Sequence, residues 1–384
     1  MEPPQQTVLL GSPKEVSLAE LEHELTQLWK EAESNHGDSF HPVVRSCTMN
    51  LIVVTEDESG ADAVAVMVGE VTLEHPARIF LVVLDRKAKE SSLNAWISAR
   101  CAIPEPGQEQ VCCEQITLVA RGQDTAKITS AVTSLLVPDV STMLLWKTSI
   151  DAEDPIVRSL LAITDRALID SSEESEPLPA FLEWRLLANA GIWEVTLGDL
   201  AWTHVTAWRA VIARAFESDA AKSLSHDLDE VTVEYSTSQV PRHSGFSQSF
   251  LLMGWLAHAF RWDAVGGPCD MKDGSVDCTL LKGKKRIRVQ LKPVTAAHGE
   301  PGGIERIVLS AGKDLAVEFK EGQPRNEIVM TMTANGQSRQ SVVPLRTLSE
   351  SELMARELEI LLRDEVYEES LDMLCLIVKG TKGS

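Results

Sequence analysis

Residues 47–84, CTMNLIVVTEDESGADAVAVMVGEVTLEHPARIFLVVL, indicate the fold class of the first half of the chain. Residues 47–54 and 78–84 are apolar runs of strand length, and residues 61–74, which follow Gly60, predict a helix between them. A strand, a helix and a strand at this spacing form a βαβ unit, whose strands pair in parallel through a right-handed crossover. We therefore expect an α/β fold built on a parallel sheet.

The rest of the first half continues this pattern and adds an antiparallel element. The runs 94–101 and 109–120 flank a turn that contains proline and glycine, so they predict an antiparallel pair. Near the N-terminus, Ser17 and Glu20 form a capping box before an amphipathic helix. The sequence further predicts a helix at 124–136, a strand at 142–146, a helix from Pro155, a strand at 167–172, and helices at 179–190 and 208–216. We therefore expect an α/β N-terminal domain with a mixed, partly parallel sheet.

The second half has a different pattern, in which apolar and polar residues alternate. The polar run at 217–230 predicts the boundary, so we divide the chain into domains 1–222 and 223–384. The alternation predicts strands whose inward faces carry Val231, Val233 and Tyr235, then Ile287, Val289 and Leu291, then Leu315, Val317 and Phe319. This period of two is typical of strands with one buried and one solvated face.

Turn and capping residues complete the expected second domain. Asn335 and Gly336 lie between strand-like runs and predict a type I′ hairpin. One helix, at 250–260, interrupts the strands, and a second, with Ser349 and Glu352 at its start, closes the chain. We therefore expect an α+β C-terminal domain with an antiparallel sheet covered by helices.

The chain is strongly acidic, with 36 Lys and Arg residues against 57 Asp and Glu residues among its 384, a formal net charge of −21. Nucleic acids and anionic membrane surfaces attract proteins through Lys and Arg, so this balance argues against both as the main partner. No apolar run approaches the roughly 20 residues that span a bilayer. The N-terminus lacks the positive and apolar regions of a signal peptide, and we expect a cytoplasmic protein.

The sequence lacks the common signatures of catalysis. Neither G-x-G-x-x-G nor G-x-x-x-x-G-K-[ST] occurs, so the usual glycines of dinucleotide and P-loop phosphate sites are missing. No G-x-S-x-G places a serine on a nucleophile elbow. H-E-x-x-H and C-x-x-C, which are strong zinc and dithiol signals, are also absent from the sequence. We therefore predict no catalytic residues, no cofactor and no metal.

Seven cysteines are spread through apolar segments without the dense, regular spacing of a secreted disulfide scaffold, namely residues 47, 101, 112, 113, 269, 278 and 375. We expect most of them to be reduced thiols in the core. Cys112 and Cys113 are adjacent on a predicted strand, so their side chains point to opposite faces. They are either two small buried hydrophobes or part of a redox sensor, in which one thiol pairs with Cys101 across the predicted hairpin.

KGKKRIR, residues 282–288, places five basic residues within seven positions of an acidic chain. Strand alternation puts Arg286 and Arg288 on one face, opposite Ile287. The simpler interpretation is a solvated outer face of the sheet. The functional interpretation is a site for a phosphate or an acidic partner.

IDSS, residues 169–172, ends a predicted strand at the edge where open α/β sheets bind ligands. Asp170, Ser171 and Ser172 are therefore candidate binding residues, although the sequence pairs no nucleophile with a base there. Together with the basic run, this turn supports an alternative function for the chain, that of an enzyme or metabolite sensor that binds a sugar phosphate.

The run LGDLAWTHVTAWRAVIARAF, residues 197–216, closes the first half. Asp199 is placed to cap a short turn before Trp202. Trp208 falls on the apolar face of the helix that follows and is assigned to the core, whereas Arg209 falls off that face. Exposed Trp and Arg side chains are favoured anchors of protein interfaces, so a protein-binding surface is the alternative interpretation of this run.

Six segments, in one order, resemble a known family. They are HPARIFLVVLD, ISARC, VCCEQITL, LLVPDVSTMLLW, DRALIDSS and LGDLAWTHVTAWRAVIARAF. Together they resemble the OpcA family, the glucose-6-phosphate dehydrogenase assembly proteins of bacteria. The resemblance is strong over about residues 40–217 and looser afterwards, through LLMGWLAHAFRW and the strands that follow it.

The resemblance implies a non-enzymatic partner of glucose-6-phosphate dehydrogenase. Such proteins promote assembly of the active oligomer or act as allosteric activators that raise the affinity of the enzyme for substrate, and they support NADPH production in the oxidative pentose phosphate pathway. The matching segments supply six candidate partner-binding residues: Arg78, Arg100, Glu114, Asp170, Trp202 and Arg209.

The resemblance also implies thioredoxin as a candidate partner, because in some relatives from photosynthetic bacteria thioredoxin acts through cysteines of the OpcA protein itself. Cys47, Cys101, Cys112 and Cys113 lie in matching segments and are the candidate redox residues. The resemblance leaves open which of them form a regulatory pair.

Overall fold

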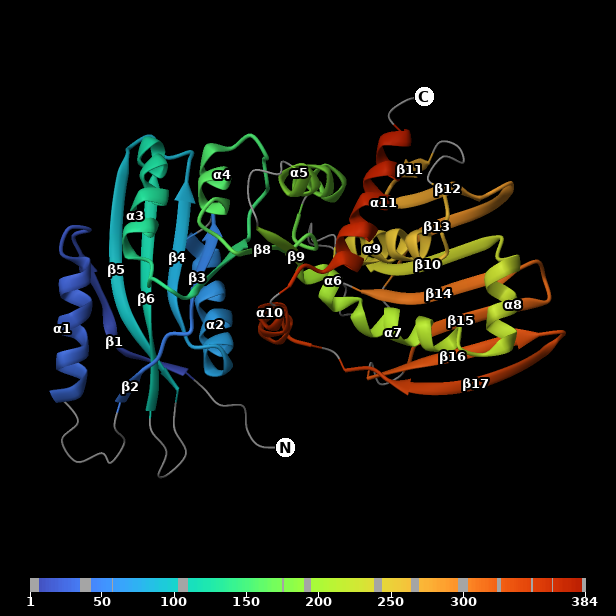
Figure 1. Cartoon of the computed structure of the whole chain (residues 1–384), viewed down its shortest axis with the longest axis horizontal. Helices are drawn as coiled ribbons and strands as arrows, with labels where there is room; N and C mark the ends of the chain where they lie inside the picture. The colour runs from blue at the N-terminus through green and yellow to red at the C-terminus, as the bar shows by residue number, and fades with distance from the viewer. Residues whose placement is uncertain are drawn as a thin grey trace. The chain divides into compact units, whose positions relative to one another are not determined.

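In a computed structural model, the chain folds into two compact units, each with its own sheet (Figure 1). Unit 1 consists of Met1–Ile169, Ala190–Leu197 and Glu350–Leu362, and unit 2 consists of Asp170–Asn189, Gly198–Ser349 and Arg363–Ser384. The structure describes residues 7–34, 43–56, 58–102, 110–174, 176–189, 195–237, 244–263, 269–295, 303–322, 326–346, 348–360 and 362–381.

Unit 1 is built on a nine-stranded mixed sheet in the order β1-β5-β6-β4-β3-β7-β8-β9, with β2 beside β6. The strands are β1 (Thr7–Val16), β2 (Val43–Arg45), β3 (Met49–Thr55), β4 (Ala77–Asp85), β5 (Ser92–Ala102), β6 (Gln110–Arg121), β7 (Ser141–Trp146), β8 (Arg166–Ile169) and β9 (Thr196–Asp199). From β6 through β4, β3 and β7 to β8 the strands are parallel, whereas β5 is antiparallel to both β1 and β6. The predicted α/β fold with a mixed, partly parallel sheet is confirmed.

The stretch 47–84 forms the centre of this sheet. β3 and β4 pair in parallel, with Leu51 opposite Ile79, and helix α2 (Glu58–Glu74) connects them. Every residue of β3 is buried, as expected for a parallel strand covered on both faces. The predicted βαβ unit and the predicted antiparallel pair β5–β6 are therefore both confirmed.

The other helices of unit 1 are α1 (Leu21–Ser34), the 3₁₀ helix η1 (Gly122–Lys127), α3 (Ile128–Leu135), α4 (Pro155–Leu161) and α10 (Glu350–Glu359). Helix α10 comes from the far end of the sequence. Its Glu357 pairs with Arg166 of β8, and both side chains are at most 2% exposed. Its Ser351 donates a hydrogen bond of 2.6 Å to Glu70 of α2. A segment that the sequence assigned to the second domain therefore completes unit 1.

Unit 2 contains an eight-stranded sheet in the order β11-β12-β13-β10-β14-β15-β16-β17. The strands are β10 (Glu230–Thr237), β11 (Asp270–Lys272), β12 (Ser275–Lys282), β13 (Lys285–Thr295), β14 (Ile304–Ala311), β15 (Leu315–Glu321), β16 (Glu327–Ala334) and β17 (Gln337–Pro344). Only β10 and β13 pair in parallel among these neighbours. Asn335 and Gly336 form the β16–β17 turn with φ of 51° and 75°, which confirms the predicted hairpin.

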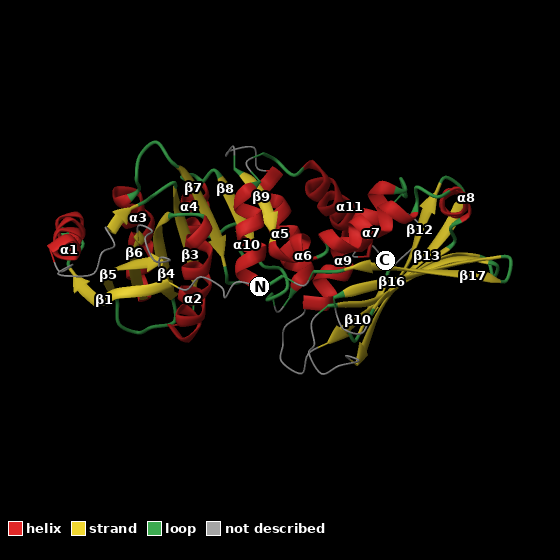
Figure 2. Ribbon diagram, turned by 90° about the horizontal axis from the view of Figure 1, so that it is seen from below, coloured by secondary structure: helices red, strands yellow, loops and turns green. Residues whose placement is uncertain are grey.

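Among the described residues of unit 2, helices lie on one face of the sheet (Figure 2). They are α5 (Pro177–Asn189), α6 (Leu200–His204), α7 (Thr206–Ala215), α8 (Asp219–Asp227), α9 (Ser244–Ala259) and α11 (Glu365–Thr381). Helix α9 packs on β10, β13 and β14 and against α11. The sequence did not predict α11, since it predicted that the preceding helix closes the chain.

The two units divide the chain differently from the expected domains 1–222 and 223–384. Residues 170–189 and 198–222 pack in unit 2. The polar run at 217–230 also contains a helix, because Ser218 caps α8, which buries Ala221 and Leu224. A mostly polar segment with two apolar side chains on one face can pack as an amphipathic helix, and polarity alone did not distinguish it from a linker.

Candidate functional site

Glu114 of β6 lies at the centre of a buried ionic cluster in unit 1. Its Oε2 accepts a hydrogen bond of 2.7 Å from Arg78 Nε, and its Oε1 accepts one of 2.6 Å from Trp29 Nε1 and pairs with Arg45 Nη2 at 2.7 Å. Arg78 also pairs with Glu22 Oε1 at 2.8 Å. We call Glu22, Trp29, Arg45, Arg78 and Glu114 the Glu114 cluster.

The topology places Arg78 beside Glu114, because β4 and β6 are neighbouring parallel strands and both residues immediately precede the pair Ile79–Gln115. Their side chains are only 5% and 4% exposed. A buried charge is tolerated where it is paired and hydrogen-bonded, and this cluster meets both conditions. Because Glu22 and Trp29 belong to α1, the cluster also fastens that helix to the sheet.

A disulfide lies beside the Glu114 cluster. Cys101 of β5 and Cys112 of β6 are directly opposite in the antiparallel register, with Cα atoms 4.0 Å apart. Both side chains are buried, and Trp29 and Leu28 of α1 pack against them. Trp29 therefore contacts the disulfide and holds Glu114 with its indole N–H, so the two features share one side chain.

The expectation that most cysteines are reduced is wrong, because a second disulfide joins Cys269 to Cys278 and four of the seven cysteines are thus paired. In both pairs the Cα atoms are less than about 7 Å apart, close enough for a bond. Of the other candidate redox residues, Cys47 and Cys113 are free thiols. Burial raises the pKa of Cys113 to about 11, which keeps this thiol protonated near neutral pH.

Arg100 occupies the other face of β5 from Cys101. It is half-buried, and its Nε donates a hydrogen bond of 2.5 Å to Gln115 of β6. Burial lowers the pKa of its guanidinium group. The exposed part of Arg100 remains accessible to a partner, whereas Arg78 and Glu114 are enclosed by the fold of unit 1.

In unit 2, Trp202 of α6 and Arg209 of α7 are brought into direct contact. The Arg209 guanidinium lies 3.5 Å from the centre of the buried Trp202 ring, a cation–π arrangement. Trp202 Nε1 donates a hydrogen bond of 2.9 Å to Asp364 Oδ2, and its ring packs 5.5 Å from that of Tyr367. Trp202 is therefore part of the core, and the half-buried Arg209 is the accessible member of the pair.

Asp199 caps α6, as the sequence predicted, and its carboxyl group is fully buried. Its Oδ1 accepts hydrogen bonds from the backbone N–H groups of Ala201 at 2.9 Å and Ser171 at 3.1 Å. Burial raises the pKa of Asp199 to about 7, and the nearby charge of Asp170 adds to this rise. The IDSS turn is therefore tied to a buried acid, and its Asp170 also accepts a 3.1 Å hydrogen bond from the N–H of Ser172.

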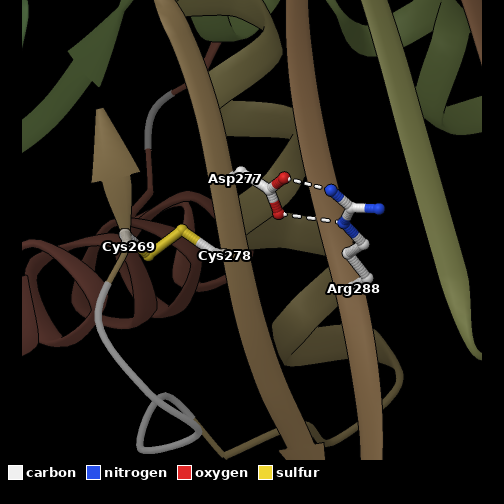
Figure 3. Close-up of a disulfide and its surroundings, with 4 residues drawn as sticks. All are labelled: Cys269, Asp277, Cys278 and Arg288. Carbon is white, nitrogen blue, oxygen red and sulfur yellow. Dashed lines mark hydrogen bonds and ion pairs between the residues drawn. A yellow bond between two sulfur atoms is a disulfide. The ribbon is translucent and has the colours of Figure 1, made fainter. Parts of the chain in front are cut away.

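The basic run 282–288 spans the end of β12, the turn that follows it and the first residues of β13. Ile287 is buried while Arg286 and Arg288 are exposed, as the alternation predicted. Arg288 forms two hydrogen bonds with Asp277, which Figure 3 shows beside the disulfide of the same strand. Asp277 thus compensates one charge of the run, which favours the interpretation of this face as a solvated sheet surface.

The six candidate partner-binding residues do not form one cluster within either unit. Unit 1 brings Arg78 and Glu114 together, and unit 2 brings Trp202 and Arg209 together. Glu22, Trp29 and Arg45 around Glu114, and Asp364 beside Trp202, were not identified from the sequence. No local signal in the sequence linked Trp29 to a carboxylate 85 residues away.

Neither a metal site nor a membrane-spanning helix is found in the described part of the chain. No group of three His, Cys, Asp or Glu side chains there is arranged to hold a metal ion. No helix of these residues is long and apolar enough to cross a membrane.

Two family models match the chain, one in each half. The glucose-6-phosphate dehydrogenase subunit N-terminal domain matches residues 68–185, and the C-terminal domain of the same subunit matches residues 195–371. Two curated relatives are both named putative OxPP cycle protein OpcA. That of Nostoc punctiforme is 24% identical over 330 residues, which are 81% of this chain and 67% of the relative. That of Synechococcus elongatus is 24% identical over 335 residues, which are 82% and 71%.

A solved structure, a 3-ketoreductase from Actinomadura kijaniata, aligns with 88% of this chain and 98% of its own. Its TM-score is 0.46 and its sequence identity 11%, which are too low to support an argument about fold or activity.

Proposed function

The chain belongs to the OpcA family, whose two domains are described as those of a glucose-6-phosphate dehydrogenase subunit, and we propose that it binds this dehydrogenase and favours its active oligomer. The observation that carries the proposal is the match of both family domains, in order, over residues 68–185 and 195–371. The two relatives' name, putative OxPP cycle protein OpcA, supports the proposal. We propose in addition that the chain supports NADPH production in the oxidative pentose phosphate pathway and that it acts in the cytoplasm.

We propose that the chain acts as an allosteric activator with no catalytic step of its own. An activator shifts an equilibrium only if it binds the active form more tightly than the inactive form. By linkage, glucose 6-phosphate and this chain then each strengthen the binding of the other to the dehydrogenase. No covalent chemistry by the chain is needed for this effect.

Half-buried residues are the best candidates for direct contact with the dehydrogenase. We propose Arg100, Asp170 and Arg209 for this role, because part of each side chain reaches the surface. Arg78, Glu114 and Trp202 are buried and would act indirectly, Arg78 and Glu114 by holding α1 against the sheet and Trp202 by orienting Arg209. Arg and Trp are common anchors of interfaces, and an Arg held against a Trp ring loses less rotamer freedom on binding.

The test measures the rate of NADPH formation as a function of glucose 6-phosphate concentration. It uses the glucose-6-phosphate dehydrogenase from the same cells as this chain, in the presence and absence of the chain. We expect a higher maximal rate or a lower half-saturation, together with a complex on sizing and no turnover by the chain alone. An unchanged curve and no complex would contradict the proposal. Binding of glucose 6-phosphate to the isolated chain would instead support the alternative, a sugar-phosphate enzyme or sensor.

We further propose that Cys101 and Cys112 are the redox-active pair and that thioredoxin reduces them. In this exchange the thioredoxin dithiol becomes a disulfide, while Cys101 and Cys112 take up two electrons and two protons as thiols. Both sulfurs are buried under Trp29, so attack requires α1 to move away from the sheet. Reduction would thereby act on the Glu114 cluster, which shares Trp29.

Activation of the dehydrogenase by the oxidised chain, the reduced chain and a Cys101→Ser/Cys112→Ser variant tests the redox proposal. We expect the variant to match the reduced chain and to be insensitive to thioredoxin. A Cys269→Ser/Cys278→Ser variant is the control, and it should keep the response. Equal activation by oxidised and reduced native chain would remove the proposal.

A further inference from the structure

Strand β17 is the edge of the unit 2 sheet, and it differs from the other sheet edges of the described chain (Figure 1). At the opposite edge of the same sheet, β11 is three residues long. In unit 1, β9 is four residues long, and β1 breaks its register between Leu10 and Lys14. Short or irregular edges of this kind protect a sheet from pairing with another chain.

β17 is neither short nor irregular, and its one proline, Pro344, is its last residue. It is eight residues long and pairs with β16 in unbroken register from Glu327↔Pro344 to Ala334↔Gln337. Arg339 is its one charged residue. An edge strand presents unpaired backbone N–H and C=O groups on its outer side, and a long regular one is a template for a further strand.

Several apolar side chains of the β16–β17 hairpin are also partly or largely exposed to solvent. Met330 and Met332 lie on the same face as the buried Val317 and Phe319 but stay partly exposed. On β17 the Val342 side chain is 56% exposed. The hairpin therefore offers apolar surface on both of its faces beside the free edge.

The charge of the β16–β17 hairpin indicates which kind of partner can approach it. No acidic residue occurs from Ile328 to Arg346, although the whole chain has a net charge of −21. Two copies of so acidic a chain repel each other over most of their surface. The repulsion is smallest where acidic residues are lacking, and β17 lies in that segment.

From these observations we propose that β17 pairs antiparallel with β17 of a second copy of this chain, which joins the two eight-stranded sheets across a two-fold axis. A symmetric pair of antiparallel strands has its axis at one residue, because the hydrogen-bonding groups alternate along each strand. With the axis at Gln340, Arg339 is opposite Ser341 of the second copy. With the axis at Ser341, Arg339 is opposite Val343. Neither register places two guanidinium groups face to face.

One strand pair of this length, with the apolar side chains beside it, makes a small interface. We therefore expect a reversible dimer whose population rises with protein concentration. A dimer would present two copies of every dehydrogenase-binding surface, a consequence that rests on the proposed function and that would raise affinity through multivalency.

The experiment is sedimentation equilibrium of the full chain alone over a range of concentrations, so its outcome does not depend on the dehydrogenase. We expect the mass to rise from 42.1 kDa toward twice that value. Amide hydrogen exchange in 337–344 should slow over the same range, because pairing protects the outward N–H groups.

A Gln340→Glu/Ser341→Glu variant places carboxylates opposite each other in either register and should weaken dimerisation on the order of tenfold or more. Both native side chains are exposed, so the far-UV circular dichroism should not change. Thr133→Glu/Ser134→Glu is the matched control, since these neighbours are exposed on α3 and the added charge is equal.

A native chain that keeps the mass of one copy at every concentration would overturn the proposal, as would an edge variant that dimerises as well as the control. If the native chain is monomeric and the edge variant fails to activate the dehydrogenase, the edge belongs to the dehydrogenase and not to a second copy.

Discussion

Several buried side chains form their ion pairs and hydrogen bonds with residues far away in the sequence. Glu114 is 4% exposed and contacts Arg78, Arg45 and Trp29 at 2.7, 2.7 and 2.6 Å. When one partner of such a buried pair is removed, the charge that stays behind loses its buried counter-charge; Arg78 would keep only Glu22, whose side chain is 56% exposed. The effect of a substitution at this scale therefore depends on burial more than on the distance between the charges.

For Glu114→Gln, we expect a loss of about 3–5 kcal/mol in the free energy of unfolding, because Arg78 loses its buried carboxylate. Urea unfolding followed by circular dichroism measures this loss. Glu153→Gln is the control, since Glu153 contacts Arg158 at 2.6 Å but its side chain is 81% exposed. The control should change the free energy by less than about 1 kcal/mol. Equal effects of the two substitutions would contradict the importance of burial.

For Asp199→Asn, the expected effect depends on pH. Burial raises the pKa of Asp199 to about 7 from 3.8, so between these values the folded chain keeps a proton that the unfolded chain loses. The native free energy of unfolding therefore falls by about 1.4 kcal/mol per pH unit from this group as pH rises through the window. Asparagine does not titrate and still offers Oδ1 to the N–H groups of Ser171 and Ala201. As pH rises to about 7, the variant should therefore become more stable relative to the native chain.

Urea midpoints at a series of pH values measure this difference. Asp277→Asn should show the opposite pH dependence of stability. The hydrogen bond from Arg288 lowers the pKa of Asp277, so the stability that this carboxylate contributes is lost as pH falls. A difference between native chain and Asp199→Asn that is constant from pH 4 to pH 8 would show that Asp199 has no such pKa.

At the scale of elements, the packing of α9 against α11 depends on one small residue. A Cβ at Gly254 would lie 2.6 Å from both Leu374 Cγ and the carbonyl oxygen of Ser370. Backbone atoms of α11 cannot move aside as a side-chain end can, so the two helices pack closely only where α9 has a glycine. Helix α9 lies in turn between α11 and the sheet, and its position affects the whole core of unit 2.

We expect Gly254→Ala to lower Tm by at least about 2 °C, because overpacking strain of about 1–3 kcal/mol exceeds the gain in helix propensity. Thermal unfolding followed by circular dichroism measures the change. Gly303→Ala is the matched control, since the nearest atom to its added Cβ, Gln248 Oε1, is 3.8 Å away. A higher Tm for Gly254→Ala than for the control would show that α11 adjusts without strain.

At the scale of the whole molecule, neither unit is a continuous piece of sequence. Unit 1 recruits Glu350–Leu362, and unit 2 recruits Arg363–Ser384. The C-terminal segment supplies Glu357 to buried Arg166 in unit 1 and Asp364 to Trp202 in unit 2. The last part of the chain is therefore needed to complete both cores.

A chain that ends at Ser349 should consequently lose stability in both units, with a marked fall in Tm or loss of soluble protein. Arg166 would be left buried without its carboxylate, and α9 would lose α11. A chain that ends at Thr381 keeps both helices and is the control, measured by the same thermal unfolding. A truncated chain that melts like the control would mean that each core is complete without the C-terminal segment.

Elements with local sequence signals could be predicted from the amino-acid sequence alone. The apolar runs around 61–74 predicted the βαβ unit, period-two alternation predicted the strands of unit 2, and Asn335-Gly336 predicted the hairpin. Such features depend on neighbouring residues, and the spacing and φ preferences of these residues follow directly from the sequence. The family resemblance likewise rests on segments that can be read in order.

Contacts between residues far apart in the sequence could be identified only from the folded chain. It selected Cys112 rather than Cys113 as the partner of Cys101, because strand register sends adjacent side chains to opposite faces. It joined Trp29 to Glu114, and it returned the C-terminal helices to two different cores. These contacts lower the free energy only after the elements have packed, and no local pattern in the chain encodes which elements pack together.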